Sequence, residues 1–393
     1  MIDTAGQLVV DFPLRKEGES FPPPRYAEYR QRDGLVLSYL PDGKPVWLVT
    51  RHAAVREILT SRKVSSNPDH KGFPNIGETM GVPRQDQIPG WFVGMDSPDH
   101  DRFRRALIPE FTVRRVREMR PAIQGVIDTV IDDLLANGPQ ADLINDFALP
   151  IPSLVISALL GVPTVDREFF ESRTRTLVAV RASTDQERDT ASRELLRYIN
   201  RLIEIKSKWP ADDLPSRLLA NGVLHPQELS GVLLLLLIAG HETTANNIGL
   251  GIVSLLENPQ WIGDERVVEE LLRLHSVADL VSLRVAVEDV EICGQVIRAG
   301  EGLVPLVAAA NHDESVFACP HMFNPERSAR QHVAFGYGVH QCLGQNLVRV
   351  EMELAYRTLF ERIPGLRLTV DDEGLPFKYD GVLHGLHALP VRW

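Results

Sequence analysis

The chain has 393 residues, and its 44% hydrophobic and 24% charged content is typical of a globular protein rather than a disordered or fibrous one. A net charge of −11 excludes the uniformly basic surface that nucleic-acid binding needs, so we expect no nucleic-acid partner. Three scattered cysteines cannot form a disulfide framework, and the N-terminus lacks a basic-then-apolar targeting pattern. The longest apolar run, 232–239, is far too short to span a bilayer, so we expect a cytoplasmic protein without a membrane partner.

Hydrophobic periodicity predicts a mainly α protein with a minor β sheet. In chain order, we expect a strand over 46–50, helices over 112–135, 187–208 and 231–257, a strand-like piece over 290–297 and a helix over 343–362. The absence of repeats and of an evident linker predicts a single domain over 1–393. Five prolines and five glycines between 66 and 99 predict a long loop, which is either a lid over a site or an irregular surface connection.

A glycine-rich turn brings a cysteine to the start of the last predicted helix. Its sequence is Phe335-Gly-Tyr-Gly-Val-His-Gln-Cys342-Leu-Gly344. Unpaired N–H groups and the helix dipole stabilise a thiolate at such a terminus, and a thiolate ligates metal ions. An isolated cysteine on a turn is more often a small buried apolar residue, so the assignment depends on the surrounding pattern.

The turn matches Phe-Gly-x-Gly-x-His-x-Cys-x-Gly at every fixed position and resembles the haem-ligand signature of the cytochrome P450 superfamily. The resemblance implies that the Cys342 thiolate is the axial ligand of the iron of haem b, and that Phe335, Gly336 and Gly344 contact this cofactor. It also implies a single-domain fold with the haem buried between a long central helix and the cysteine turn. Cys293 and Cys319 lack this context and are expected to be structural.

The long helix over 231–257 carries a polar patch, Ala239-Gly-His-Glu242-Thr243-Thr, near its middle. The patch resembles the oxygen-activation motif of the same family, which implies an acid at Glu242, a proton-delivering hydroxyl at Thr243 and a haem contact at Ala239. Cleaving O2 consumes protons in a dry pocket, so an acid beside an alcohol suits the chemistry. We expect Thr243 to bond its own backbone and distort the helix. Without the cysteine turn, an internally satisfied polar cluster would explain the patch equally well.

Two further sets of charged residues have family counterparts. Glu270 and Arg273 lie three residues apart, which by itself describes an ordinary surface ion pair. The resemblance implies that they form a buried structural triad with Arg327. It also implies a set of haem-propionate contacts, each of which alone could be a surface cation: His100, Arg104, Arg284 and His340.

The resemblance implies a monooxygenase that uses O2 and electrons from a ferredoxin with its ferredoxin reductase. Seven arginines between 102 and 120 predict a local basic face for an acidic ferredoxin, although a solvated helix would look the same. The chain is most similar to soluble actinobacterial members, which implies a hydrophobic secondary metabolite such as a macrolide, a polyene or a steroid-like compound as substrate. Candidate substrate contacts are Phe92, Val93, Leu236, Ala239, Val281, Val382 and Leu383.

Two other functions remain open from the residues. A non-catalytic haem-thiolate sensor or carrier would also need Cys342, but it would not need Glu242 and Thr243. A hydrolase could use Cys342 as nucleophile and His340 as base, although residues two apart on a turn seldom face each other and no orienting acid is evident.

Overall fold

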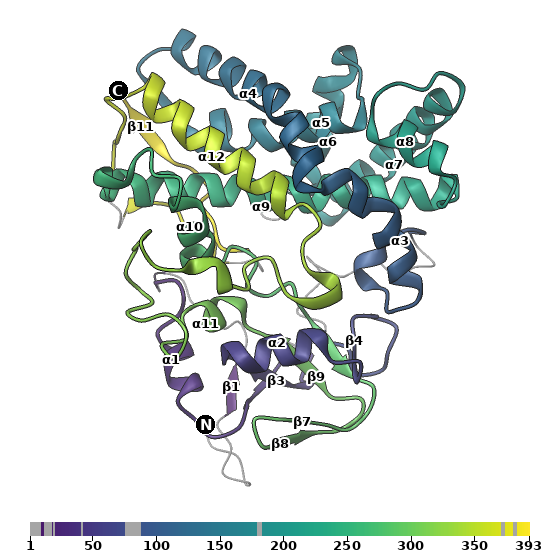
Figure 1. Cartoon of the computed structure of the whole chain (residues 1–393), viewed down its shortest axis with the longest axis vertical. Helices are drawn as coiled ribbons and strands as arrows, with labels where there is room; N and C mark the ends of the chain where they lie inside the picture. The colour runs from purple at the N-terminus through teal and green to yellow at the C-terminus, as the bar shows by residue number, and fades with distance from the viewer. Residues whose placement is uncertain are drawn as a thin grey trace.

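The computed structural model describes residues 9–11, 18, 20–40, 42–74, 88–178, 183–370, 374–379 and 383–393. Most helices form one large part of the molecule, and the main sheet with three short helices forms a smaller part beneath it (Figure 1). Helix α9, Pro226–Glu257, runs across the whole width of the helical part (Figure 1). The fold is therefore mainly helical with minor sheet, as the sequence predicts.

The helical part consists of α3 (Asp99–Leu107), α4 (Val113–Ala136), α5 (Pro150–Leu160), α6 (Arg167–Val178), α7 (Asp185–Lys208), α8 (Leu214–Asn221), α9, α10 (Val267–His275) and α12 (Gln345–Arg362). The smaller part contains α1 (Arg25–Arg30), α2 (His52–Thr60) and α11 (Val307–Asn311). One hydrophobic core lies among α3, α4, α5, α7, α9, α10 and α12, and two smaller clusters lie against the sheet.

The main sheet has the strand order β1-β2-β3-β9-β6-β4. Its strands are β1 (Val9–Asp11), β2 (Val36–Tyr39), β3 (Pro45–Val49), β4 (Val64–Ser65), β6 (Arg284–Ala286) and β9 (Gly302–Pro305). β3 pairs antiparallel with β2 and parallel with β9, and Val46 lies opposite Gly302 in that register. β5 (Gln140–Asp142), β10 (Arg367–Leu368) and β11 (Pro390–Arg392) form a second, three-stranded sheet.

The strand-like piece expected over 290–297 is two strands rather than one. β7 (Val290–Ile292) and β8 (Gln295–Ile297) pair antiparallel, and the chain reverses between them at Cys293 and Gly294, both of which have positive φ. The turn was not predicted because β-branched residues lie on both sides of it, although a glycine within such a run is a turn signal.

Helix α9 begins five residues earlier than the sequence analysis expected. Pro226 occupies its first turn, and the Glu228 carboxylate accepts a hydrogen bond from the backbone N–H of His225 at 2.9 Å, which completes a capping box. By length and hydropathy α9 could cross a bilayer, but 61% of its most apolar stretch is buried within the protein. It is therefore a core helix, and it ends at Asn258 before Pro259.

Helix α12 follows the cysteine turn and packs against α4 and α9. The Tyr356 hydroxyl donates a hydrogen bond of 2.8 Å to the Asn247 carbonyl oxygen of α9. Glu351, on the same helix, is fully buried, and its Oε2 atom has no hydrogen-bond partner among the described residues. Burial raises the pKa of Glu351 to about 8, so this side chain is protonated in the folded protein at neutral pH.

The raised pKa of Glu351 makes stability depend on pH in a stated direction. Between about pH 4.5 and pH 8 the folded state keeps a proton that the unfolded state has released, so the free energy of unfolding falls as pH rises through this window. Glu351→Gln mimics the protonated acid, so its unfolding free energy should be less pH-dependent and should exceed that of the unaltered protein at pH 8. Urea unfolding from pH 4.5 to 8, with exposed Glu361→Gln as control, measures this. Parallel curves for Glu351→Gln and the unaltered protein would contradict it.

Candidate functional site

The turn that carries Cys342 is fixed by its own backbone. The Cys342 N–H donates a 2.8 Å hydrogen bond to the Phe335 carbonyl oxygen and closes the loop. Gly336 and Gly338 have φ of 69° and 74°, which a residue with a side chain rarely adopts. A Cβ at Gly338 would also lie 2.5 Å from the Leu59 carbonyl oxygen of α2. The turn therefore requires glycine at these two positions in order to place the cysteine just before α12.

Cys342 is half-buried, and positively charged or partly positive groups surround its thiol. Burial raises the pKa of Cys342, and the backbone N–H groups of Gly344 and Gln345 and the guanidinium groups of Arg104 and Arg349 act in the opposite direction. Such surroundings suit a sulfur whose negative charge is shared with a metal ion. A Cβ on Gly344 would meet no protein atom within 4 Å, so the space on that side is open.

One stripe of α9 is accessible although most of this helix is buried, and we call the open space beside this stripe the hollow. Ala239 is exposed, and Leu236 and Thr243 are half-exposed, at the spacing of three and four residues that defines one helix face. Gly240 belongs to a different face, because a Cβ there would lie 2.8 Å from the Ile156 side chain of α5. Thus Ala239 leaves room in the hollow, whereas Gly240 allows α5 and α9 to pack closely.

The acid and the alcohol of α9 are held by different partners. The Thr243 hydroxyl donates a 2.7 Å hydrogen bond to the Ala239 carbonyl oxygen, as the sequence predicts, within a helix that runs without interruption from Pro226 to Glu257. The Glu242 carboxylate forms an ion pair with Lys378, with 2.7 Å between Oε1 and Nζ. Lys378 was not among the residues named from the sequence.

Two histidines and two arginines lie together beside the cysteine turn. The rings of His100 and His340 are 4.0 Å apart, and His340 Nε2 is 3.0 Å from the Ser66 hydroxyl. Burial, Arg284, His100 and Arg104 together lower the pKa of His340 to about 2, so its ring is neutral. Burial also lowers the pKa of Arg284 to about 10.

These four residues are short of anionic partners. Both ring nitrogens of His100 lack a hydrogen bond among the described residues, and its Nδ1 atom is 3.5 Å from Asp101. In that part of the chain, Arg104 pairs with no carboxylate, and the guanidinium of Arg284 donates to its neighbouring Leu283 carbonyl oxygen at 2.7 Å. Buried cations and donors of this kind require negative groups, such as the two propionates of a haem.

The residues around the hollow fit the haem that the sequence implies. They supply one thiol, open space beside the turn, a small exposed residue on α9 and donors for two carboxylates. Among the described residues, no group of three or more His, Cys, Asp and Glu could hold a metal ion, so an ion at Cys342 would take its remaining ligands mainly from a cofactor.

A buried ion-pair network lies behind the turn. Glu270 receives hydrogen bonds of 2.8 Å from both Nε and Nη2 of Arg273, and one of 2.9 Å from Nε of Arg327. The side chains of Glu270 and Arg273 are both 0% exposed. Arg273 also donates to the Asn311 carbonyl oxygen at 2.9 Å, which ties α10 to α11. The three charged residues named from the sequence therefore meet in one cluster.

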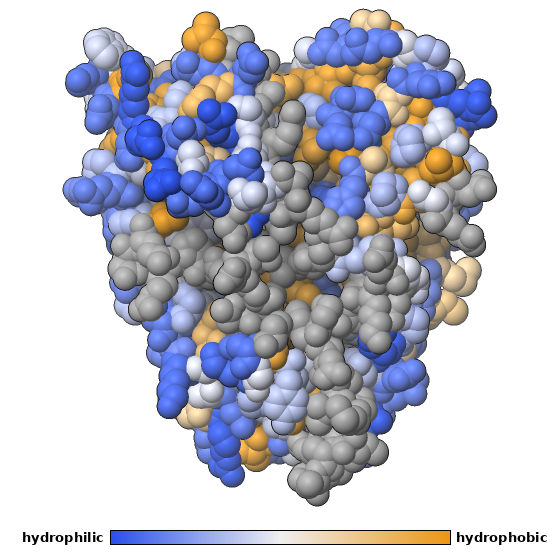
Figure 2. Space-filling model, turned by 180° about the vertical axis from the view of Figure 1, so that it is seen from behind, coloured by the Kyte–Doolittle hydropathy of each residue, from blue (hydrophilic) through white to orange (hydrophobic). Residues whose placement is uncertain are grey.

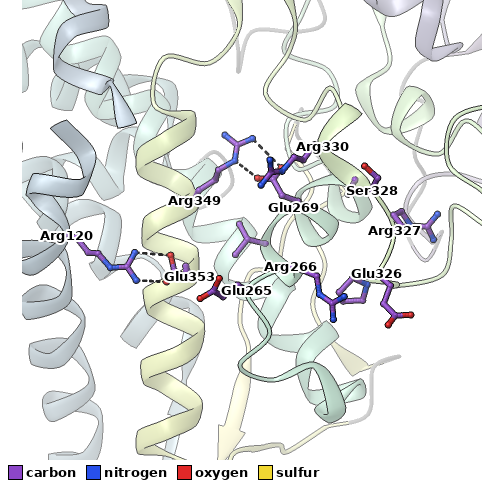
Figure 3. A pocket seen from close by; sticks show the side chains of 13 residues that line it. Arg120, Glu265, Arg266, Glu269, Glu326, Arg327, Ser328, Arg330, Arg349 and Glu353 are labelled. Carbon is purple, nitrogen blue, oxygen red and sulfur yellow. Dashed lines mark hydrogen bonds and ion pairs between the residues drawn. The ribbon is translucent and has the colours of Figure 1, made fainter. Parts of the chain in front are cut away.

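A charged cleft of about 610 Å³ lies between α4, α10, α12 and residues 325–330 (Figure 3). Arg349 crosses one wall of it and donates to Glu269 at 2.5 Å (Figure 3). Although burial opposes ionisation, hydrogen bonds from His332 and Arg349 lower the pKa of Glu269 to about 2. Arg349 also covers the Phe335 ring at 4.7 Å, so the pair steadies the base of the cysteine turn.

The candidate substrate contacts differ in accessibility. Val93 and Val281 are exposed, and Leu236 and Leu383 are half-exposed. Phe92 is buried and stacks on Phe103 of α3 with ring centroids 6.0 Å apart, so it belongs to the packing between the loop and α3. Val382 lies outside the described residues, as do residues 75–87 of the long loop.

Comparison with known proteins gives consistent matches. The family model described as Cytochrome P450 matches residues 265–367. Pentalenic acid synthase of Streptomyces avermitilis is 44% identical over 99% of both chains, and Vitamin D3 dihydroxylase of Streptomyces griseolus is 41% identical over 100% of both. The crystal structure of cytochrome P450 MoxA from Nonomuraea recticatena aligns with a TM-score of 0.91 and 42% identity over 98% of each chain.

Neither alternative function gains support. The two curated relatives are named as a synthase and a dihydroxylase, that is, as enzymes, so a non-catalytic sensor or carrier is not indicated. The His340 ring contacts Ser66 and His100, and within the described ranges it makes no hydrogen bond to Cys342. The nucleophile–base pair of a hydrolase is therefore not formed.

Removing Glu270, the acid at the centre of the buried ion-pair network, should destabilise the folded protein. Glu270→Ala would leave the charges of Arg273 and Arg327 without their carboxylate, and we expect the free energy of unfolding to fall by ~3–5 kcal/mol. Glu326→Ala removes an exposed carboxylate near the same network and should change it by less than about 0.5 kcal/mol. Urea denaturation compares the two variants, and equal unfolding free energies would refute the structural role of Glu270.

Proposed function

The chain belongs to the cytochrome P450 family, and from this premise we propose a role for each part of the site. The protein is a haem b monooxygenase that hydroxylates a hydrophobic small molecule with O2 and electrons from a redox partner. We assign the iron ligand to Cys342. The observation that carries this assignment is the position of its thiol beside two backbone N–H groups at the start of α12, next to the open space at Gly344.

Haem, when bound, supplies the reductive activation of O2 and the transfer of one oxygen atom to the substrate. The chain's own residues hold the cofactor and its charge. His100, Arg104, Arg284 and His340 bind the propionates, which explains why half-buried Arg104 and buried Arg284 form no ion pair with a carboxylate among the described residues. The Glu270 network and the Arg349–Glu269 pair keep the cysteine turn rigid behind the ligand.

Proton delivery falls to Glu242 and Thr243 of α9. The Glu242 carboxylate takes up a proton from solvent at the edge of the helix and delivers it toward the hollow. The Thr243 Oγ1 atom faces the same hollow, and its hydrogen bond to the Ala239 carbonyl oxygen fixes this hydroxyl so that its lone pairs can accept from a water molecule. This pair moves protons where the apolar surroundings otherwise exclude water.

The substrate binds above Ala239, against Leu236, Val93, Val281 and Leu383. These side chains are apolar and at least half-exposed, so they favour a hydrophobic molecule over a charged one. The named functions of the relatives favour a secondary metabolite or a steroid-like compound. A cytoplasmic location agrees with such an enzyme and with the burial of α9.

Ferredoxin, reduced by a ferredoxin reductase, is the proposed electron donor, and its docking surface is smaller than the sequence suggested. Four of the seven arginines pair with acids of this chain: Arg102 with Glu228, Arg114 and Arg115 with Glu118, and Arg120 with Glu353. Arg104 turns toward Cys342. The exposed Arg105 and Arg117 remain without an acidic partner among the described residues.

These two arginines accompany exposed apolar residues beside the cysteine turn. Val113 is 60% exposed, Val339 is 55% exposed and Ile108 is 47% exposed. Asn346 of α12 donates to the Phe111 carbonyl oxygen at 2.9 Å, which joins the corner between α3 and α4 to the turn. We call Arg105, Ile108, Val113, Arg117 and Val339 the docking patch. Its cations attract an acidic partner, and its apolar residues make the contact.

Charge reversal within the docking patch should weaken the productive encounter. Arg105→Glu with Arg117→Glu is expected to raise the apparent KM for a ferredoxin at least about tenfold at low salt and to flatten the dependence of turnover on salt. Arg193→Glu, a reversal on the exposed surface of α7, should change neither. Ferredoxin titrations from 20 to 300 mM salt would measure both quantities. Salt-independent turnover by the unaltered protein would eliminate electrostatic docking.

The assignment of Cys342 is tested by the absorption of the reduced protein under carbon monoxide. The unaltered protein should show the strongly red-shifted Soret band of a thiolate-ligated haem, because the thiolate donates electron density to the iron. Cys342→Ser should lose this band, and Cys319→Ser, which alters an exposed cysteine, should keep it. A band that survives in Cys342→Ser would mean that another residue is the ligand.

A further inference from the structure

The Glu242 carboxylate forms an ion pair with Lys378, which lies 136 residues later in the chain. Lys378 Nζ lies 2.7 Å from Glu242 Oε1 and 3.1 Å from Asn246 Oδ1. Glu242 and Asn246 are four residues apart and therefore share one face of α9. The Lys378 side chain is 16% exposed and that of Glu242 is 20% exposed, so this ion pair is screened less by solvent than a surface pair.

Lys378 belongs to a short hairpin, residues 376–379 and 383–387, which we call the C-terminal hairpin. Its two arms are joined by backbone hydrogen bonds of 2.8 Å from Lys378 to Gly385 and from His387 to Pro376. The hairpin lies directly on α9, because a Cβ on Gly385 would be 2.2 Å from Asn246 Oδ1.

Aromatic stacking holds the C-terminal hairpin from the opposite side. The His384 ring lies between Phe377, at a centroid distance of 5.9 Å, and Phe21, at 3.9 Å. The backbone N–H of His384 donates to the Val277 carbonyl oxygen at 2.8 Å. Several contacts therefore hold the backbone that carries Lys378 in place, and they limit the positions that its ammonium group can take beside the carboxylate.

We propose that Lys378 is a positioning residue that sets where the Glu242 carboxylate waits between proton transfers. A glutamate side chain has three rotatable bonds, and an ion pair with a fixed ammonium selects one orientation among many. Lys378 holds Glu242 as a carboxylate, the side chain leaves the ammonium group when it takes up a proton from solvent, and it returns after it has given that proton to the hollow. This inference rests on the proposed role of Glu242 in proton delivery.

The same hairpin bears Leu383, one of the proposed substrate contacts. The hairpin therefore carries both a proposed substrate contact and the ion-pair partner of the acid. Lys378 acts through Glu242, which makes it a positioning residue rather than a catalytic one.

The chain offers a matched control for loss of a lysine ion pair. Lys206 pairs with Asp213 between α7 and the start of α8, and the two side chains are 13% and 4% exposed. Lys206→Met therefore removes a comparably buried lysine–carboxylate pair from a part of the fold that lies outside the proposed site.

The first experiment measures coupling in the holoenzyme, with vitamin D3 as the probe substrate and an external ferredoxin system. The variants are Lys378→Met, Lys378→Arg, Glu242→Gln, the Lys378→Met/Glu242→Gln double variant and Lys206→Met. The readout is hydroxylated product relative to hydrogen peroxide. Lys378→Met should lower this ratio about tenfold, a smaller share than the ~100-fold or more that a positioned acid supplies directly. Lys378→Arg should restore most of it, and the double variant should be no worse than Glu242→Gln alone.

The outcomes separate the inference from the proposed function. A native ratio in Lys378→Met with a lowered ratio in Glu242→Gln would overturn the role of Lys378 and leave that of Glu242 intact. Native ratios in both would overturn both roles. Failure of Lys378→Arg to restore the ratio would also overturn the inference, because the charge would then not be what matters.

The second experiment needs no turnover. Crystal structures should show the Glu242 carboxylate in one orientation in the unaltered protein and in several in Lys378→Met, since this variant removes the cation that selects the orientation. Lys206→Met should keep the single orientation. An unchanged single orientation of Glu242 in Lys378→Met would overturn the inference.

Discussion

The rest of the structure depends on one constraint, which is that the negative charge of the Cys342 sulfur must be stabilised inside the protein. Burial raises the pKa of Cys342, and the N–H groups of Gly344 and Gln345 oppose this effect because α12 begins directly after the turn. The close approach of Gly338 to α2 and the positive φ values of the turn fix that junction. Two contacts anchor α12 to the rest of the helical part. Its Tyr356 hydroxyl donates to a carbonyl oxygen of α9, and its Arg349 pairs with Glu269 of α10.

Much of the fold could be predicted because its longest helices have strong local signals. Helix α4 begins after Thr112, within a residue of the expected start, because periodicity and an N-cap coincide. The start of α9 was placed five residues late because the apolar run drew more weight than Pro226 and Glu228, which form the actual cap. The break between β7 and β8 escaped notice because it is a two-residue turn within β-branched composition. Strand order in the main sheet depends on contacts over long sequence separations and has no local signal.

The candidate site divides in the same way. Residues that share a motif could be named from the sequence, and the structure places His100, Arg284 and His340 beside one another although they come from three distant segments. It could not be predicted which residue of a motif leaves open space and which is needed for helix packing. Ala239 opens the hollow whereas the adjacent Gly240 is needed for packing on α5, and only the neighbouring helix decides which is which. Lys378 was missed because it is 136 residues from Glu242 and lies in no recognisable pattern.

The stacking of Phe21 on His384 has a practical meaning for anyone who redesigns the ends of this chain. Through His384 and the C-terminal hairpin, Phe21 is linked to the segment that carries the ion-pair partner of Glu242. An affinity tag or a fused electron-transfer domain that pulls on residue 21 would therefore act mechanically on the oxygen chemistry. The C-terminus ends instead on the three-stranded sheet, where Trp393 bonds to the Pro139 carbonyl oxygen, so it is the better attachment point for added sequence.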